Sequence, residues 1–239
     1  MTALPNVNPP VTGNPPAPTV IPLKGLRGSI ARNMTEGWKA PRVGMGMDVD
    51  MTTALTRLKE LQSEVGTQRL TVTAFMLRAV ALALKAHPRM NAFLREGGIE
   101  LAPQVNLGVA VSVENGLMVP VIVRADELSL VDLAGQMRKL AEAARSGALP
   151  PKAYQGGTFT VTNLGMTGID WFTPILNPPQ VGILGVSRVV DKPVAKEREI
   201  VVAPMTTLTL VFDHRAVDGY PAALFLAEVK QRLESRGQG

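Results

Sequence analysis

The sequence predicts an α/β protein, a two-layer sandwich in which helices pack on one large mixed β-sheet. Amphipathic helical segments alternate with β-branched strand segments along the chain. Some strands are joined by a hairpin turn and others are separated by a whole helix, so antiparallel and parallel pairs should both occur. With 239 residues, 46% of them hydrophobic and 19% charged, the chain can bury one sizeable core.

The first 20 residues differ in composition from the rest. They contain six of the 19 prolines and can bury little, which predicts a proline-rich, extended linker or tail. Such a tail fits a chain with a domain tethered upstream, although a merely frayed terminus has the same composition. We expect the globular domain to occupy residues 21–239.

The next segments predict three helices and one strand. A short helix is expected over residues 29–38 and a strand over residues 43–49. Apolar residues at helical spacing predict an amphipathic helix over residues 54–65. Residues 71–86 are apolar nearly all round, so this helix should be buried, and it ends at His87 because a residue before proline is pushed out of the α region.

A hairpin is expected in the middle of the chain. Two apolar, β-branched runs, residues 105–113 and 117–123, flank Asn115-Gly116, a strong hairpin-turn signal. Ser129 and Asp132 follow as a variant of the capping box, with Asp in place of the usual Glu. They predict the start of another helix.

The remaining segments predict the rest of the sheet. The helix that starts at Ser129 should end at Gly147. Strands are then expected at residues 158–162, 181–190 and 206–212. A last helix should run from Pro221 to about Leu233, because proline is well placed at a first helical position.

The basic excess of the chain does not indicate a nucleic-acid partner. The formal charge is +5, but lysines and arginines are scattered and aromatic residues make up only 4% of the chain. Nucleic-acid-binding proteins concentrate basic side chains on one face and often add aromatic side chains that stack on bases. We expect no nucleic acid among the partners, whereas an anionic small ligand is compatible with the charge.

The chain has no cysteine and only two histidines, His87 and His214. The absence of thiols excludes disulfides and cysteine-ligated zinc, and it fits a reducing compartment. The two histidines are 127 positions apart and form no metal-binding motif, so we expect no metal. No apolar run reaches membrane-spanning length and the N-terminus lacks a signal-peptide pattern, so we expect a cytoplasmic protein without membrane contact.

His214 is the strongest candidate for a catalytic residue. It follows an alternating apolar strand and precedes the last helix, at a strand end where a rigid sheet presents functional groups. An imidazole titrates near neutral pH and can take a proton from a thiol and return it. Any such thiol must come with a substrate, since the chain has none. The alternative is a hydrogen-bonded structural histidine, and helix capping is the expected role of His87.

Two carboxylates flank this histidine in the sequence. Asp213 precedes it directly, and Asp218 follows four residues later, just before Gly219. A nearby carboxylate could fix the loop through Arg215 or steady the imidazole tautomer. Asp218 could equally be a turn residue.

A second candidate segment covers residues 156–165. The segment has two glycines, a strand, two small polar residues and another glycine. This pattern indicates a backbone that another group, such as a ligand, approaches closely. Thr162 and Asn163 could present a hydroxyl and an amide to a ligand or a developing oxyanion. The alternative is a strand end satisfied by its own turn. The nucleophile elbow of hydrolases and the phosphate-binding loop of nucleotide-binding proteins are both absent.

These two segments together resemble the catalytic domain of the dihydrolipoamide acyltransferases, the core components of 2-oxo acid dehydrogenase complexes. The similarity rests on the His-x-x-x-Asp-Gly of His214 to Gly219 and on the Thr-Phe-Thr-Val-Thr-Asn-Leu-Gly run about fifty residues earlier. Other family-like segments extend it over nearly all of residues 22–233: residues 22–34, 106–121 and 177–186. The histidine motif also occurs in chloramphenicol acetyltransferase, so the resemblance implies a fold of that type.

The resemblance implies a role for each matching residue. His214 would be the general base that deprotonates the thiol of coenzyme A or of dihydrolipoamide. Thr162 lies where the family usually has a serine whose hydroxyl stabilises the oxyanion, and Asp218 would support the His214 loop. The coenzyme A site would be lined by Asn163, Gly185 and Ser187.

The resemblance also implies an assembly. In this family the active site is a channel between subunits of a homotrimer, so His214 and Thr162 would come from different chains. Trimers build larger cubic or icosahedral cores, but residues 234–239 are polar where the family often ends in an apolar anchor, which leaves assembly beyond the trimer open. The expected partners are a lipoyl domain, absent from this sequence, and the dehydrogenase subunits of the complex.

The function expected is that of a dihydrolipoyllysine-residue acyltransferase that moves an acyl group between lipoamide and its substrate coenzyme A. Acetyl and branched-chain acyl groups are the favoured substrates, and the sequence does not separate them from succinyl. Two alternatives stay open: a coenzyme A-dependent O- or N-acyltransferase of the same fold, and a structural core without catalytic activity.

Overall fold

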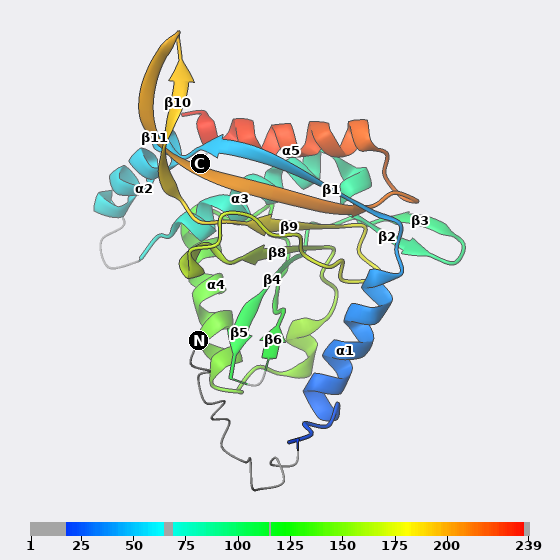
Figure 1. The fold of residues 1–239 in the computed structure, drawn as a ribbon. Coiled ribbons are helices and arrows are strands. Elements are labelled where there is room, and N and C mark those ends of the chain that lie inside the picture. Colours follow the sequence, from blue (N-terminus) through cyan, green and yellow to red (C-terminus); the bar gives the residue numbers. More distant parts are fainter. Residues whose placement is uncertain (1–17, 65–68, 115, 237–239) are drawn as a thin grey trace, which may run out of the picture.

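The computed structural model describes residues 18–64, 69–114 and 116–236 (Figure 1). Most of the predicted proline-rich tail, residues 1–17, and the turn residue Asn115 therefore lie outside the described residues. The helices are α1 (Gly25–Trp38), α2 (Thr52–Glu64), α3 (Val72–Ala86), α4 (Leu130–Arg145) and α5 (Gly219–Glu234), with 3₁₀ turns at Pro88–Met90, Pro151–Tyr154 and Gly165–Thr167. The strands are β1 (Arg42–Asp50), β2 (Ala92–Arg95), β3 (Gly98–Leu101), β4 (Leu107–Val109), β5 (Val111–Val113), β6 (Gly116–Met118), β7 (Val121–Ile122), β8 (Phe159–Asn163), β9 (Gly182–Val186), β10 (Val190–Lys196) and β11 (Glu199–Asp213).

A seven-stranded sheet organises the molecule. Its strand order is β1-β11-β9-β8-β4-β7, and β10 pairs with β11. The pairs β4·β8 and β8·β9 are parallel and the others antiparallel, so the predicted α/β class with a large mixed sheet is confirmed. None of the described helices is long and apolar enough to cross a membrane.

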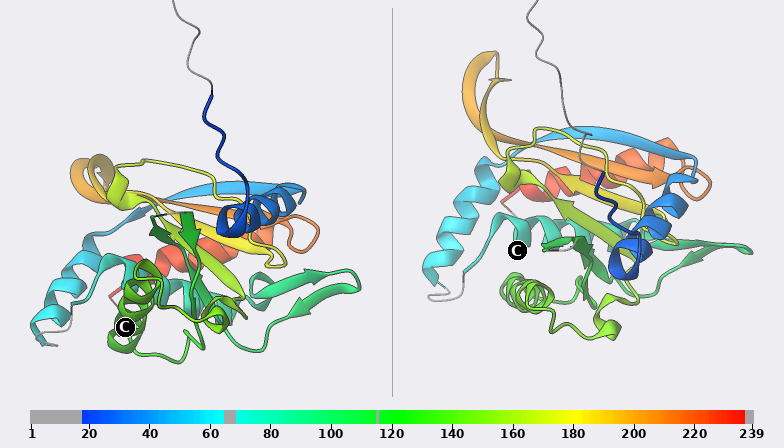
Figure 2. Two further views of the ribbon diagram at one scale, coloured as in Figure 1. Left: turned by 90° about the horizontal axis from the view of Figure 1, so that it is seen from below. Right: turned by 60° about the horizontal axis from the view of Figure 1, so that its bottom comes forward.

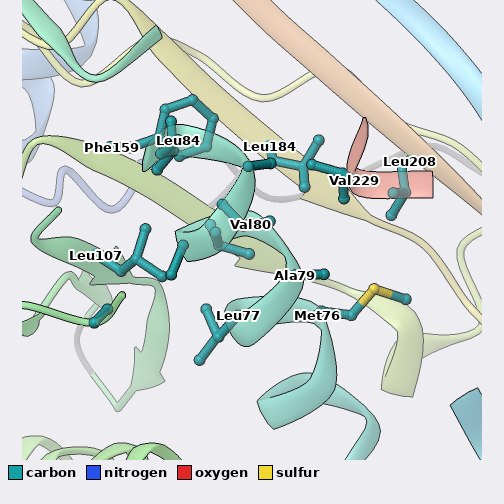
Figure 3. Close-up of a cluster of buried hydrophobic side chains, with 14 of the residues drawn as sticks. Met76, Leu77, Ala79, Val80, Leu84, Leu107, Phe159, Leu184, Leu208 and Val229 are labelled. Carbon is teal, nitrogen blue, oxygen red and sulfur yellow. The ribbon is translucent and has the colours of Figure 1, made fainter. Parts of the chain in front are cut away.

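The hydrophobic core lies on one face of the sheet, under α3 and α5. Val80 and Leu84 of α3 lie close to Phe159 and Leu184 of the sheet and to Val229 of α5, all of them almost fully buried (Figure 3). Helix α3 buries side chains on nearly every side, as its uniformly apolar sequence predicts. This layer fixes the backbone of the central strands.

The opposite face of the sheet is covered by α1 and by the chain between β8 and β9. Figure 2 shows α1 on the other side of the sheet from α5. Close approach between these two covering parts depends on Gly37, because a Cβ there would lie 2.2 Å from the carbonyl oxygen of Leu176. A cavity remains between this cover and the sheet.

Several element boundaries differ from the sequence prediction. The apolar runs around the central hairpin are each divided in two. Pro120, which has no N–H to donate, separates β6 from β7, and β5 leaves the large sheet to pair with β6. The strand expected over residues 181–190 ends at Val186, and the hairpin β2·β3 and strand β10 were missed.

The predicted helix starts agree with the structure in one case and differ from it in two. Ser129 Oγ accepts a hydrogen bond from Asp132 N–H, which confirms Ser129 as the N-cap, but the Asp132 carboxylate accepts from the Ser129 hydroxyl and not from its backbone N–H as in a full capping box. Helix α1 begins at Gly25, earlier than predicted, and α5 begins at Gly219, so Pro221 is its third residue rather than its first. The missing N–H still costs nothing there, because no N–H in the first turn has an intrahelical acceptor.

Candidate active site

The cavity between α1 and the sheet has a volume of about 260 Å³. Its lining is mostly apolar and comes from α1, the β5·β6 region, β8, the covering segment and β9: Ile30, Asn33, Met34, Ala110, Leu117, Val119, Thr160, Thr162, Phe172, Pro174, Ile175, Asn177 and Ile183. Within the described part of the chain the Thr162 hydroxyl has no hydrogen-bond partner. It is therefore free to donate a hydrogen bond to a molecule in the cavity.

A hydrogen-bonded network fixes the polar side of this cavity. Asn33 Nδ2 on α1 donates to Asn177 Oδ1 at 2.8 Å. Thr160 Oγ1 donates to Gln180 Oε1 at 2.6 Å, and Gln180 Nε2 donates to the carbonyl oxygen of Gly157 at 2.9 Å. Thr160 and Gln180 are both buried, so these bonds form in a low-dielectric environment where an unpaired group would be costly.

The three residues expected to line the coenzyme A site lie in different surroundings. Gly185 pairs with Thr162 in the sheet, and a Cβ there would lie 3.0 Å from the ring of Phe172, so the glycine lets that ring rest on the strand. Asn163 points to the opposite face, where its Nδ2 donates to Thr73 Oγ1 of α3 at 3.0 Å. Ser187 is buried, and its Oγ has no partner among the described residues. The contact of these residues with coenzyme A stays a prediction.

His214 lies in a loop at the far end of β11. Its backbone N–H donates to the carbonyl oxygen of Pro41 at 3.0 Å, and its side chain is 46% exposed. The neighbouring Asp213 is buried and accepts three hydrogen bonds from Arg215: from the backbone N–H at 3.0 Å, from Nε at 3.0 Å and from Nη2 at 2.6 Å. The bonds to Asp213 raise the pKa of the Arg215 guanidinium above its usual value.

Asp218 has a looser relation to the imidazole. Its Oδ1 lies 3.9 Å from Nδ1 of His214, beyond hydrogen-bonding distance, and its side chain is 80% exposed. It occupies the N-cap position of α5 without a capping hydrogen bond. In this chain the carboxylate that ties the loop through Arg215 is that of Asp213, one of the two candidates that the sequence offered.

Thr162 and His214 are far apart within one chain. Thr162 pairs with Gly185, and Gly185 pairs with Thr209 of β11. His214 follows Thr209 by five residues, which is roughly 17 Å along an antiparallel strand. One subunit therefore cannot bring this hydroxyl and this imidazole to the same reacting atoms.

A family comparison identifies the chain. Residues 15–238 match the model of the 2-oxoacid dehydrogenases acyltransferase (catalytic domain) family. The chain belongs to this family. Within its described residues there is no group of three or more His, Cys, Asp or Glu side chains that could hold a metal ion.

Similar proteins carry related descriptions. The chain is 45% identical over 219 residues to the dihydrolipoyllysine-residue acetyltransferase component of the acetoin cleaving system of Bacillus subtilis. It is 37% identical over 217 residues to the corresponding component of the pyruvate dehydrogenase complex of Zymomonas mobilis. These alignments cover 90% of this chain but 55% and 49% of those proteins, so the chain spans about half their length.

Solved structures agree with the fold. The cubic core of a pyruvate dehydrogenase multienzyme complex is 33% identical, with a TM-score of 0.88 over 97% of this chain and 98% of that one. A dihydrolipoamide acetyltransferase from Azotobacter vinelandii is 34% identical, with a TM-score of 0.86 over 93% and 98%. A chloramphenicol acetyltransferase is 16% identical, with a TM-score of 0.55 over 84% and 94%, which supports the predicted fold type alone.

Sequence reasoning missed part of the site. It did not anticipate Asn33, Asn177 and Gln180, whose side chains build the network beside Thr160. A signal was present, because Asn177-Pro178-Pro179-Gln180 places two amides in a stretch that is otherwise apolar. Without the fold, nothing in the sequence showed that α1 would meet them.

Proposed function

We propose that this chain is the catalytic core of a dihydrolipoyllysine-residue acyltransferase, which transfers an acyl group between lipoamide and coenzyme A. One observation supports this most directly: the free Thr162 hydroxyl opens into an apolar cavity, while the exposed His214 imidazole lies roughly 17 Å along the sheet. Such separated halves complete each other when two copies of the chain meet. Family membership makes acyl transfer the reaction they fit.

The named residues of a relative support the assignment. In the Azotobacter vinelandii acetyltransferase, a serine, a histidine and an asparagine have been studied for their role in the catalytic mechanism. That serine precedes the histidine by 52 residues, and the asparagine follows it by four. Thr162, His214 and Asp218 have the same two spacings. This chain differs in carrying threonine for serine and aspartate for asparagine.

The reaction follows from the chemistry of the two side chains. His214 takes the proton of an incoming thiol, and the sulfur forms a bond to the thioester carbonyl carbon. Thr162 donates a hydrogen bond to the oxyanion that develops in the cavity. When the original C–S bond breaks, His214 returns the proton to the departing sulfur. Base catalysis contributes roughly 10²–10⁴-fold to the rate, and an oxyanion donor about 2.7–4 kcal/mol.

The proposal includes the assembly and the partners. A homotrimer or larger core would place His214 of one subunit at the cavity of its neighbour, and a relative of this family forms a cubic core. A lipoyl domain would deliver the dithiol, and the dehydrogenase subunits would deliver the acyl group. The small, mostly apolar cavity fits an acetyl or short branched acyl group. The proposed location is the cytoplasm, a reducing compartment in which the thiol substrates stay reduced.

The test is an acyl-transfer assay on the assembled protein and on its His214→Ala variant. We expect transfer between acetyl-coenzyme A and dihydrolipoamide in the parent and a loss of roughly 10²–10⁴-fold in the variant. A parent that transfers only to hydroxyl or amine acceptors would indicate an O- or N-acyltransferase instead. An assembled parent without any transfer would indicate a structural core. Rates with isobutyryl- and succinyl-coenzyme A then define the acyl group.

A further inference from the structure

Four arginines surround a second, smaller cavity on the helical side of the molecule. Its volume is about 30 Å³, and it lies where α2, α3 and the C-terminal end of α5 meet (Figure 1). The arginines come from all three places: Arg57 from α2, Arg78 from α3, Arg232 from the last turn of α5, and Arg236 just after it. The other lining residues are apolar except for Ser235.

Two of these arginines, Arg78 and Arg232, use only some of their hydrogen-bond donors. Nη1 of Arg78 donates to the carbonyl oxygen of Asp126 at 2.9 Å, and Nη2 of Arg232 is paired with Glu228 at 2.6 Å. The Nε atom of each of these guanidinium groups is buried and has no hydrogen-bond partner among the described residues. A buried donor without an acceptor costs about 1–3 kcal/mol, and more for a charged group, so this arrangement favours a further acceptor.

None of the described residues that line the cavity is acidic. Glu228 pairs with Arg232, and Asp126, whose charge acts on Arg78, also pairs with Lys85 at 3.3 Å. Burial, together with the positive charge of Arg232, lowers the pKa of Arg78 below its usual value although Asp126 opposes the shift. Four guanidinium groups and no carboxylate among the described lining residues leave a local positive charge that a bound anion would neutralise.

We propose that this four-arginine cavity binds a small oxyanion, either inorganic phosphate or the phosphate of a monoester. Guanidinium groups match the geometry of phosphate oxygens and bind them with paired, charge-assisted hydrogen bonds. A cavity of about 30 Å³ has room for about one water molecule, so one oxygen of a phosphate enters it. The remaining oxygens, or an ester group, face Arg57 and the exposed Arg236 at the rim.

This cavity is separate from the candidate active site. Arg232 is in the last turn of α5, whereas His214 precedes the first turn, and 13 residues of helix measure about 20 Å. The cavity at Thr162 lies on the opposite face of the sheet, under α1. The inference therefore does not depend on the proposed acyl transfer.

The test is a calorimetric titration of the assembled protein with inorganic phosphate, in a phosphate-free buffer of constant ionic strength. We expect one saturable site per chain, and at least about tenfold weaker binding in Arg57→Gln and in Arg78→Gln. The control is Arg145→Gln, which removes the same charge from the exposed end of α4 remote from the cavity-lining Leu130 and should bind as the parent does. His214→Ala should also leave phosphate binding unchanged.

Further measurements keep the result decisive. If Arg78→Gln proves poorly folded by thermal unfolding, Arg57→Gln and Arg236→Gln at the rim provide the answer. Glycerol 3-phosphate distinguishes the two sources, because binding as tight as that of phosphate indicates a monoester site and weaker binding indicates free phosphate. The proposal is overturned if phosphate binds without saturation, or if it binds the rim variants and Arg145→Gln equally.

Discussion

The two halves of the candidate active site are built in opposite ways. Thr162 lies on a central strand, beside a buried network that joins α1, β8 and the segment before β9. His214 lies in an outer loop that is tied by the Asp213–Arg215 pair, with nearly half of its side chain exposed. The core of the chain thus fixes the proposed oxyanion donor, whereas the proposed base is presented outward. This difference fits the proposal that His214 acts at the Thr162 cavity of a neighbouring subunit.

Among the variants that test this comparison, the largest expected effect concerns the buried half. Thr162→Val keeps the shape of the side chain but removes the hydroxyl, so we expect the rate constant of acyl transfer to fall about 10²–10³-fold with little change in substrate binding. Thr162→Ser is the matched control and should retain activity, since it keeps the donor. Steady-state kinetics of both variants provide the measurement, and a valine variant as fast as the parent would remove Thr162 from the mechanism.

The second prediction tests whether the two halves belong to different subunits. Co-expressed His214→Ala and Thr162→Val chains should form mixed trimers in which about one quarter of the interfaces combine both intact residues. We expect about a quarter of the parent activity, although each variant alone is nearly inactive. Co-expression of either variant with the double variant is the control. Mixed assemblies without recovered activity would contradict the shared site.

The third prediction concerns the rigidity of the buried half. Gln180→Leu removes the partner of the buried Thr160 hydroxyl and of the partly buried Gly157 carbonyl oxygen. We expect the free energy of unfolding to fall by about 1–3 kcal/mol, measured by denaturant titration. Gln136→Leu, at an exposed position of α4, is the control and should change it little. Equal stability of the two variants would show that the network does not stabilise the fold.

The smallest expected effect concerns the exposed half. Arg215→Gln breaks the pair with Asp213, but the arginine side chain is 57% exposed and solvent screens the charge, so we expect a loss of stability of about 1 kcal/mol or less. The rate constant of acyl transfer should nevertheless fall while KM changes little, because His214 is less well positioned. Arg215→Lys should rescue the rate only in part, since lysine lacks the planar fork. Full activity in the glutamine variant would exclude a positioning role.

Local sequence signals predicted much of the fold. The uniformly apolar stretch 71–86 gave a buried helix, and Ser129 with Asp132 gave a helix start, because each depends on contacts within a few residues. Strand β10 was missed because Val190–Lys196 pairs with the first half of β11 and is otherwise exposed, so it carries no apolar alternation. Its pairing depends on a neighbouring strand and not on burial.

The candidate site was predictable only in part. His214 stood out because histidine is rare in the chain and this one follows a strand, and Thr162 stood out because a strand flanked by glycines ends there in two small polar residues. The resemblance pointed to Asp218 as the support of the His214 loop, and the sequence could not show that Asp213 is the carboxylate buried against Arg215. The opposite directions of Thr162 and Asn163 follow from strand alternation, but only once the two faces of the sheet are known.

The tight packing of α1 has a consequence for altering the proposed substrate preference. Gly37 is not part of the cavity wall, yet any larger residue there would collide with Leu176 and push the helix outward. A screen of variants for activity on bulkier substrates should therefore select substitutions at Gly37 as well as at the residues that line the cavity. Substitutions at Gly37 would widen the cavity by moving α1 outward, and they would lower thermal stability.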